Sequence, residues 1–107
     1  MSLRRGSFRR PGRLTPAEAT NLRARAVRLA VGGIMGWHST QRRQELLLVL
    51  QGPITLQIQL PSARTRTYQI AEGHYALVPP QTLHRVLNPG CCAAHYVYVT
   101  APTSTGR

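Results

Sequence analysis

Hydrophobic and polar residues alternate along much of the chain after residue 23. The clearest case is residues 54–60, where Ile54, Leu56, Ile58 and Leu60 are separated by threonine and glutamine. Because successive side chains of a β-strand point to opposite faces, this pattern predicts a strand with one face in the core and the other in solvent. Residues 24–29, 64–70 and 95–100 alternate more weakly or are rich in tyrosine and valine, and they predict further strands.

In residues 45–50, every position after Glu45 is leucine or valine, so both faces of a strand there would be apolar. This predicts a strand buried on both faces. One face would line the interior, and the other would meet a second sheet, the N-terminal strand or a partner subunit. Gly-Pro, Pro-Ser, Glu-Gly, Pro-Pro and Asn-Pro-Gly steps separate the strand-like segments and mark turns. About eight short strands divided in this way predict an all-β sandwich or barrel.

The first 14 residues contain five arginines, two glycines and no acid, and we expect a flexible arm. The sequence Thr15-Pro16-Ala17-Glu18 then fits a helix-capping box and predicts a short helix or turn that ends near Asn21. We therefore divide the chain into a basic flexible arm with this short helix (residues 1–23), a barrel (residues 24–102) and a C-terminal tail (residues 103–107).

The chain carries 14 basic residues, all arginine, and three glutamates, which gives a net charge of +11 over 107 residues. Residues 1–28 hold eight arginines and one glutamate, so seven of these charges lie there. Residues 1–14 could neutralise nucleic-acid phosphates without sequence preference, although we favour a solubilising tail.

The longest apolar run is residues 46–50, far below the ~20 residues of a membrane helix. The basic start lacks the apolar segment of a secretory signal, and the adjacent Cys91 and Cys92 cannot easily form a disulfide with each other. We therefore expect a reduced, cytoplasmic protein.

Two segments carry the candidate chemistry. They are Gly32-x5-His38-x-Thr40-x4-Glu45-x6-Gly52 and Gly73-x5-Pro79-x-Gln81-x2-His84-x3-Asn88. They resemble the two signature motifs of the cupin superfamily, G-x5-H-x-H-x3,4-E-x6-G and G-x5-P-x-G-x2-H-x3-N, and eight of the ten fixed positions match. The resemblance covers residues 29–102. It implies a double-stranded β-helix, or jelly-roll barrel, with a metal ion and a small ligand inside.

The residues agree with that implication. His38 and Thr40 are two apart and would face the same way on a strand, Glu45 opens the next strand, and His84 joins them if the barrel closes. Two imidazoles and one carboxylate make a facial triad that suits Fe, Mn, Zn, Ni or Cu. The alternative is a metal-free barrel in which the same residues hydrogen-bond a ligand or each other.

Two positions depart from the motifs. Thr40 stands where the first motif has its second histidine, and a neutral hydroxyl is a far poorer metal ligand than imidazole. We expect Thr40 to hold a water or to support the ligands. Gln81 stands where the second motif has glycine, and the Pro79-Pro80 step can stiffen that turn instead.

Several large side chains near the motifs are candidates for the pocket wall, although packing in the core is the more common use of such residues. These candidates are Met35, Trp37, Tyr75 and Tyr96, together with Thr40. Arg42 and Arg43 lie between His38 and Glu45 and are candidates for the rim, where they could bind a carboxylate or phosphate. The alternative for this pair is a solvated turn.

These observations support two classes of function. The first is a metal-dependent cupin that acts on a small molecule, and the resemblance implies oxygenase, isomerase or decarboxylase chemistry. The second is a non-catalytic, metal-free barrel that binds a small ligand. In either case we expect a homodimer, because Leu46, Leu48 and Leu50 offer an apolar outer face.

Overall fold

The structure is a computed structural model, and it describes residues 3–103. This part of the chain contains nine strands and no helix, so no described helix could cross a membrane. The strands are β1 (Gly12–Arg13), β2 (Arg23–Leu29), β3 (Ile34–Ser39), β4 (Arg43–Gln51), β5 (Ile54–Gln59), β6 (Thr65–Ile70), β7 (Tyr75–Val78), β8 (Leu83–Leu87) and β9 (Ala94–Pro102).

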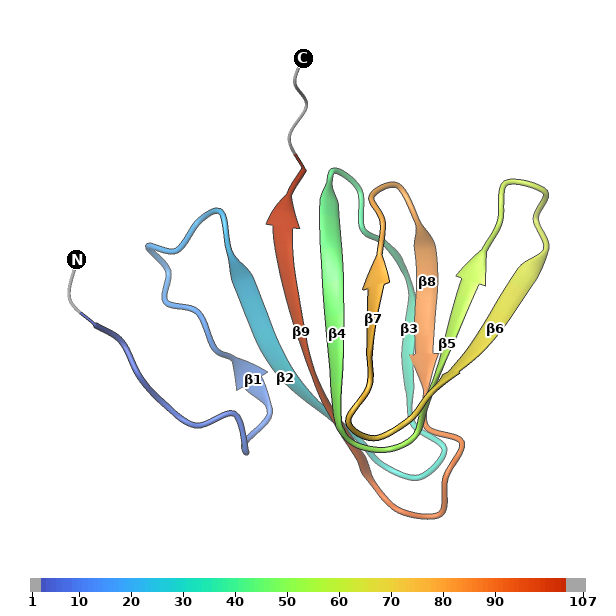
Figure 1. Cartoon of the computed structure of the whole chain (residues 1–107), viewed down its shortest axis with the longest axis horizontal. Helices are drawn as coiled ribbons and strands as arrows, with labels where there is room; N and C mark the ends of the chain where they lie inside the picture. The colour runs from blue at the N-terminus through green and yellow to red at the C-terminus, as the bar shows by residue number, and fades with distance from the viewer. Residues whose placement is uncertain (1–2, 104–107) are drawn as a thin grey trace.

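The strands form two antiparallel sheets. The first sheet has the order β1-β2-β9-β4-β7, and the second has the order β3-β8-β5-β6. The chain crosses between the sheets at the β2–β3, β3–β4, β4–β5, β6–β7, β7–β8 and β8–β9 connections, which confirms the predicted all-β jelly-roll architecture. In Figure 1 the strands lie close together at the lower end and splay apart at the upper end, where β2, β4 and β8 begin and β9 ends.

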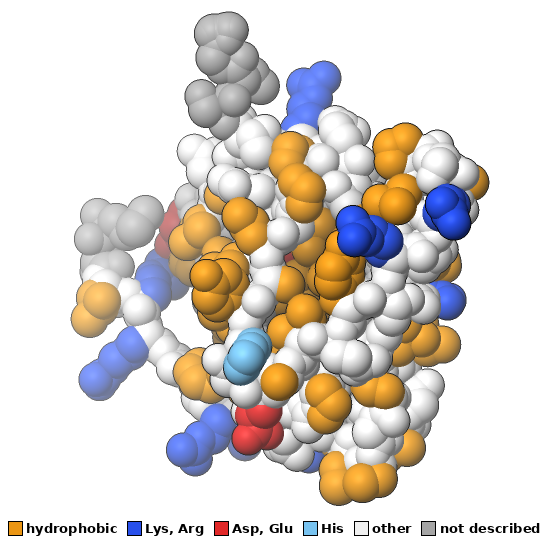
Figure 2. Space-filling model, turned by 45° about the vertical axis from the view of Figure 1, so that its right-hand side comes forward, with side chains coloured by type: hydrophobic (Ala, Val, Ile, Leu, Met, Phe, Trp, Pro, Cys, Tyr) orange, Lys and Arg blue, Asp and Glu red, His pale blue; other side chains and the backbone are white. Residues whose placement is uncertain are grey.

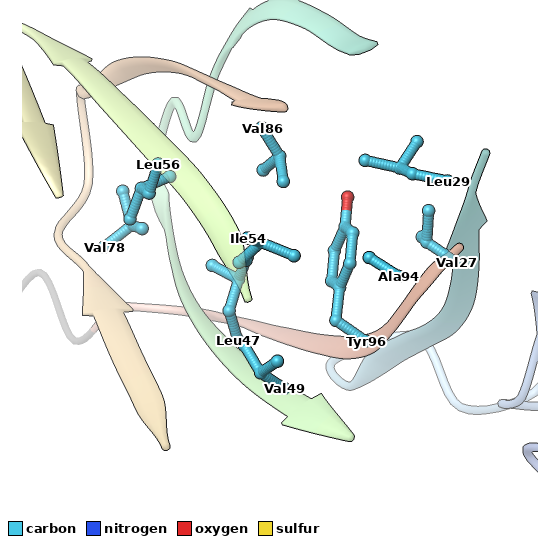
Figure 3. Close-up of a cluster of buried hydrophobic side chains, with 10 residues drawn as sticks. All are labelled: Val27, Leu29, Leu47, Val49, Ile54, Leu56, Val78, Val86, Ala94 and Tyr96. Carbon is cyan, nitrogen blue, oxygen red and sulfur yellow. The ribbon is translucent and has the colours of Figure 1, made fainter. Parts of the chain in front are cut away.

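The core lies between the two sheets and is built from alternate residues of each strand. Figure 3 shows its buried side chains pointing toward one another from both sheets. The cluster comprises Val27, Leu29, Leu47, Val49, Ile54, Leu56, Val78, Val86, Ala94 and Tyr96. Burial of these apolar groups is the main favourable contribution to folding, at about 1.5–3 kcal/mol for each large side chain.

Strand β4 is buried on its inner face only. Leu47 and Val49 are buried, whereas Leu48 and Leu50 are exposed on the outer face. The prediction of burial on both faces is therefore wrong for the single chain, because neither the second sheet nor the N-terminal strand covers these leucines.

The N-terminal segment is attached to the first sheet. Gly12 and Arg13 pair with Ala26 and Arg25 of β2 and make the edge strand β1. Residues 15–21 form bends and a turn at Ala17 and Glu18, so of the predicted helix or turn the structure contains the turn. The physical reason is that the Thr15 hydroxyl, which would cap a helix, accepts a hydrogen bond from the backbone amide of Ala24 at 3.4 Å.

The β3–β4 and β7–β8 turns lie side by side at the splayed end. The Gln81 amide donates to the carbonyl of Gln41 at 2.7 Å, and both residues have positive φ, 53° for Gln41 and 55° for Gln81. The left-handed conformation that the motif glycine would supply is thus adopted by Gln81 itself. This contact fixes the start of β8 next to the end of β3, where the candidate histidines lie.

Candidate metal centre

Three strands bring His38, Glu45 and His84 together at the splayed end of the barrel. His38 lies near the end of β3 and pairs in register with His84 at the start of β8 in the second sheet. Glu45 lies near the start of β4 in the first sheet and faces them across the interior. One donor atom from each residue lies within 4.8 Å of the other two.

Both imidazole rings are held in the same way. Nδ1 of His38 donates to the carbonyl of Gly36 at 2.8 Å, and Nδ1 of His84 donates to the carbonyl of Thr82 at 3.1 Å. In the neutral form of each ring, a proton on Nδ1 leaves the lone pair of Nε2 available to a ligand. In metal sites the ring nitrogen that does not bind the ion usually makes such a bond, which fixes the tautomer and the ring orientation. The two rings lie 4.2 Å apart between centroids.

Glu45 and His84 form a buried pair. Oε2 of Glu45 lies 3.2 Å from Nε2 of His84, and the side chains are 7% and 0% exposed. Burial lowers the pKa of His84, but hydrogen bonds to Glu45 and to the Thr82 carbonyl outweigh it, so the pKa of His84 is raised. The carboxylate therefore stabilises positive charge at this point of the interior.

These residues fit a divalent metal ion. Two ligands held ~2.1 Å from an ion at a right angle lie ~3 Å apart, which is close to the separation of the Glu45 and His84 donor atoms. Two imidazole nitrogens and one carboxylate are the donor set of the facial triad, which leaves coordination positions open for other molecules. His38 is exposed, so the site is open to solvent on one side.

The Thr40 side chain connects two turns by hydrogen bonds. Its hydroxyl donates to the carbonyl of Pro79 at 2.8 Å and accepts from the amide of Thr82 at 3.1 Å, so it joins the β3–β4 turn to the β7–β8 turn. The side chain is buried and also lines the cavity described below. At the position where the motif has its second histidine, the Thr40 hydroxyl thus stabilises the β7–β8 turn, which precedes His84.

Met35, Trp37, Tyr75 and Tyr96, the four large pocket candidates, do not line the cavity described below. Trp37 lies on the outer face under the guanidinium of Arg85, at 4.8 Å from the ring centre. Tyr75 is 68% exposed on β7, Tyr96 is buried in the core, and Met35 packs against that core. Burial, and to a smaller degree the charge of Glu45, raise the pKa of Tyr96. Met35 and Tyr96 thus pack in the core, which is the alternative use that the sequence also offered for these residues.

A cavity of about 490 Å³ opens beside the triad and includes His38 and Glu45 in its wall. Of the two rim candidates, Arg43 lines it and Arg42 does not. Tyr98 also lines it. Further lining residues were not singled out from the sequence, namely Arg13, Arg23, Arg25 and Thr100. The alternation of β2 could have predicted two of them, because Arg23 and Arg25 lie on the same face of the strand as the buried Val27 and Leu29.

The chain is similar to known proteins in sequence and in fold. The family described as "Cupin domain" matches residues 25–100. A comparison with curated protein sequences finds no match. Among solved structures, oxalate oxidase in complex with the substrate analogue glycolate has a TM-score of 0.76 at 20% identity, with 96% of this chain and 58% of that chain covered. The Cnp3 cupin domain of Schizosaccharomyces pombe has a TM-score of 0.75 at 18% identity, with coverages of 87% and 60%.

A structure of more similar size is TT1209 from Thermus thermophilus, with a TM-score of 0.71 at 19% identity and coverages of 94% and 90%. This chain spans less than two thirds of the length of the oxalate oxidase and of the Cnp3 domain. Identities of this size establish the fold alone.

Proposed function

Because the chain belongs to the cupin family, we propose that its barrel binds a divalent metal ion through His38, Glu45 and His84 and holds a small molecule beside that ion. The observation that most supports this is the common orientation of the two imidazoles, because each has Nδ1 bonded to a backbone carbonyl and so offers Nε2 to an ion. In His84 an ion would take the place of the proton through which Nε2 contacts Glu45. An ion bound there would supply Lewis-acid character and open coordination positions to a small molecule.

The test is metal content in the wild-type protein and in two alanine variants. His38→Ala removes one ligand at an exposed position, so the fold should persist. His74→Ala, at an exposed position next to β7, is the matched control. After purification without chelator or metal-affinity tag and reconstitution with Fe(II), Mn(II) or Zn(II), we expect near one equivalent in the wild type and the control. Affinity should fall about 100-fold or more in His38→Ala.

Equal metal binding in His38→Ala and His74→Ala would refute the assignment of the ligands. Circular dichroism of each variant verifies that the comparison is made between folded proteins.

A metal-free binding barrel is the second candidate, and one contact favours it. The direct hydrogen bond between Glu45 and His84 satisfies both groups without an ion. Absence of binding for every metal in the reconstitution experiment, from a correctly folded wild type, would establish this candidate over the first.

We also propose that a second copy of the chain covers the outer face of the first sheet. Leu48 pairs in register with Tyr75, and Leu46 pairs with Leu77, so the apolar side chains of β4 and β7 are adjacent. Tyr75 and Leu77 are 68% and 59% exposed. Figure 2 shows hydrophobic side chains gathered in the middle of one face of the molecule. Contiguous apolar surface of this kind marks interaction sites.

Leu48→Glu is expected to convert a dimer into a monomer, because it places a charge in the centre of this surface. Light scattering after size exclusion measures the mass. Leu22→Glu, which changes an exposed leucine outside the strands, is the control and should leave the dimer intact. A wild-type protein that is monomeric at micromolar concentration would contradict the proposal.

A further inference from the structure

Four arginines surround one side of the triad. Arg23 and Arg25 lie on the inner side of β2, in the same register rows as Thr100 and Tyr98 of β9. Arg13 of β1 pairs directly with Arg25. Arg43 precedes Glu45 by two residues on β4 and therefore has the same parity. All four line the cavity that also contains His38 and Glu45.

Protein carboxylates do not neutralise this cluster. Within residues 3–103 the only ion pairs are Arg4 with Glu18 and His84 with Glu45. Glu45, the one acidic residue of the cavity, is already bonded to His84. Guanidinium groups stay charged at any physiological pH, so the cavity concentrates positive charge.

Like charges in opposed positions of a sheet destabilise it. Arg13 pairs with Arg25, and Arg43 bonds Thr100, the residue that pairs with Arg23. These arginines therefore carry a repulsion that no carboxylate within residues 3–103 compensates by an ion pair. An anion between these groups removes that repulsion and gains charge-assisted hydrogen bonds, which are often bidentate for guanidinium with carboxylate or phosphate.

We infer that the cavity binds a small ligand that carries a carboxylate or phosphate group, held by Arg25 and Arg23 while the rest of the ligand faces the triad. The cavity volume of about 490 Å³ is in the range of small-molecule sites. Arg43 is itself positioned by hydrogen bonds to the side chain and carbonyl of Thr100, each 2.9 Å long, so it forms a fixed wall of this site. The inference rests on the proposed function, because it names the class of molecule that the site would take.

The test compares two variants of one strand that remove the same charge. Arg25→Gln changes the inner face of β2, and Arg28→Gln changes its outer face. Calorimetry at 0.15 M salt measures binding of malonate and of inorganic phosphate, with neutral malonamide as the uncharged counterpart of malonate. We expect Arg25→Gln to weaken the binding of at least one anion about tenfold or more and Arg28→Gln to weaken it less than about twofold. Malonamide should bind much more weakly than malonate.

The preferred anion identifies the charged group of the ligand. Tighter binding of malonate indicates a carboxylate ligand, and tighter binding of phosphate indicates a phosphate ester. Equal losses in the two variants, no binding of either anion, or malonamide binding as tight as malonate would overturn the inference. Arg23→Gln is a second inner-face variant if Arg25→Gln does not fold.

Metal content of the same variants separates this inference from the proposed function. Normal metal binding with no difference between Arg25→Gln and Arg28→Gln overturns the anion site alone. A protein without metal in which the two variants still differ overturns the metal site alone.

Discussion

His84→Ala is expected to abolish metal binding and to lower the free energy of unfolding by about 3–5 kcal/mol. The side chain is fully buried, and its removal leaves the Glu45 carboxylate in the interior without a partner and the Thr82 carbonyl without its donor. Because a small domain is stable by only about 5–15 kcal/mol, this variant is expected to be close to unfolding. Urea denaturation followed by circular dichroism measures the effect.

A double variant tests the physical reason. If the loss comes mainly from the uncompensated carboxylate, Glu45→Gln in the His84→Ala background should recover part of the stability, although it removes a further native group. Strictly additive losses from the two substitutions would contradict this explanation. His38→Ala, which removes an exposed ligand, should lose metal with little loss of stability.

Asn88→Ala is expected to destabilise the barrel by about 2–3 kcal/mol and to lower Tm by ~10 °C or more. Nδ2 of Asn88 donates to the carbonyls of Leu29, Ala30 and Cys92 at 3.1, 3.2 and 2.8 Å. Its Oδ1 accepts from the amide of Gly90 at 2.9 Å. The side chain is buried, so the backbone groups that lose it gain no bond to bulk water in return. Thermal denaturation measures the loss.

Asn88→Asp is the informative comparison. It keeps the oxygen that accepts from Gly90 but turns a second oxygen toward three carbonyls, so it should be less stable than Asn88→Ala at neutral pH. Equal stability of the wild type and Asn88→Asp would mean that the amide donor contributes nothing.

The triad was predicted from two motifs and from their resemblance to the cupin signatures. His38 and Glu45 lie on consecutive strands joined by a short turn, and the second motif places His84 at the start of a strand after Pro79-Pro80. The alternation of residues 54–60 likewise predicted β5 and its buried face, since a period of two is a property of any strand. The alternation depends on near neighbours in the chain, which is why the sequence contained it. The meeting of His84 with His38 and Glu45 depends on closure of the barrel, which the resemblance implied.

The pocket wall depended on features that are not local. Met35 and His38 both face inward although they are three residues apart, because the pairing of β3 with β8 shifts register between them. Strict alternation instead groups Met35 with Trp37, which the structure places on the outer face. The role of Arg25 in the cavity follows from the pairing of β2 with β9, which joins segments some 70 residues apart.

The candidate ligands come from both sheets, two from the second and one from the first, and they meet where the strands diverge most in Figure 1. An ion or ligand bound by all three residues at once would therefore join the two sheets at this end of the barrel. Binding of an ion or ligand should then slow the local opening of this end of the barrel. Amide hydrogen exchange at the end of β3 and the start of β4 should slow more than exchange at the opposite end.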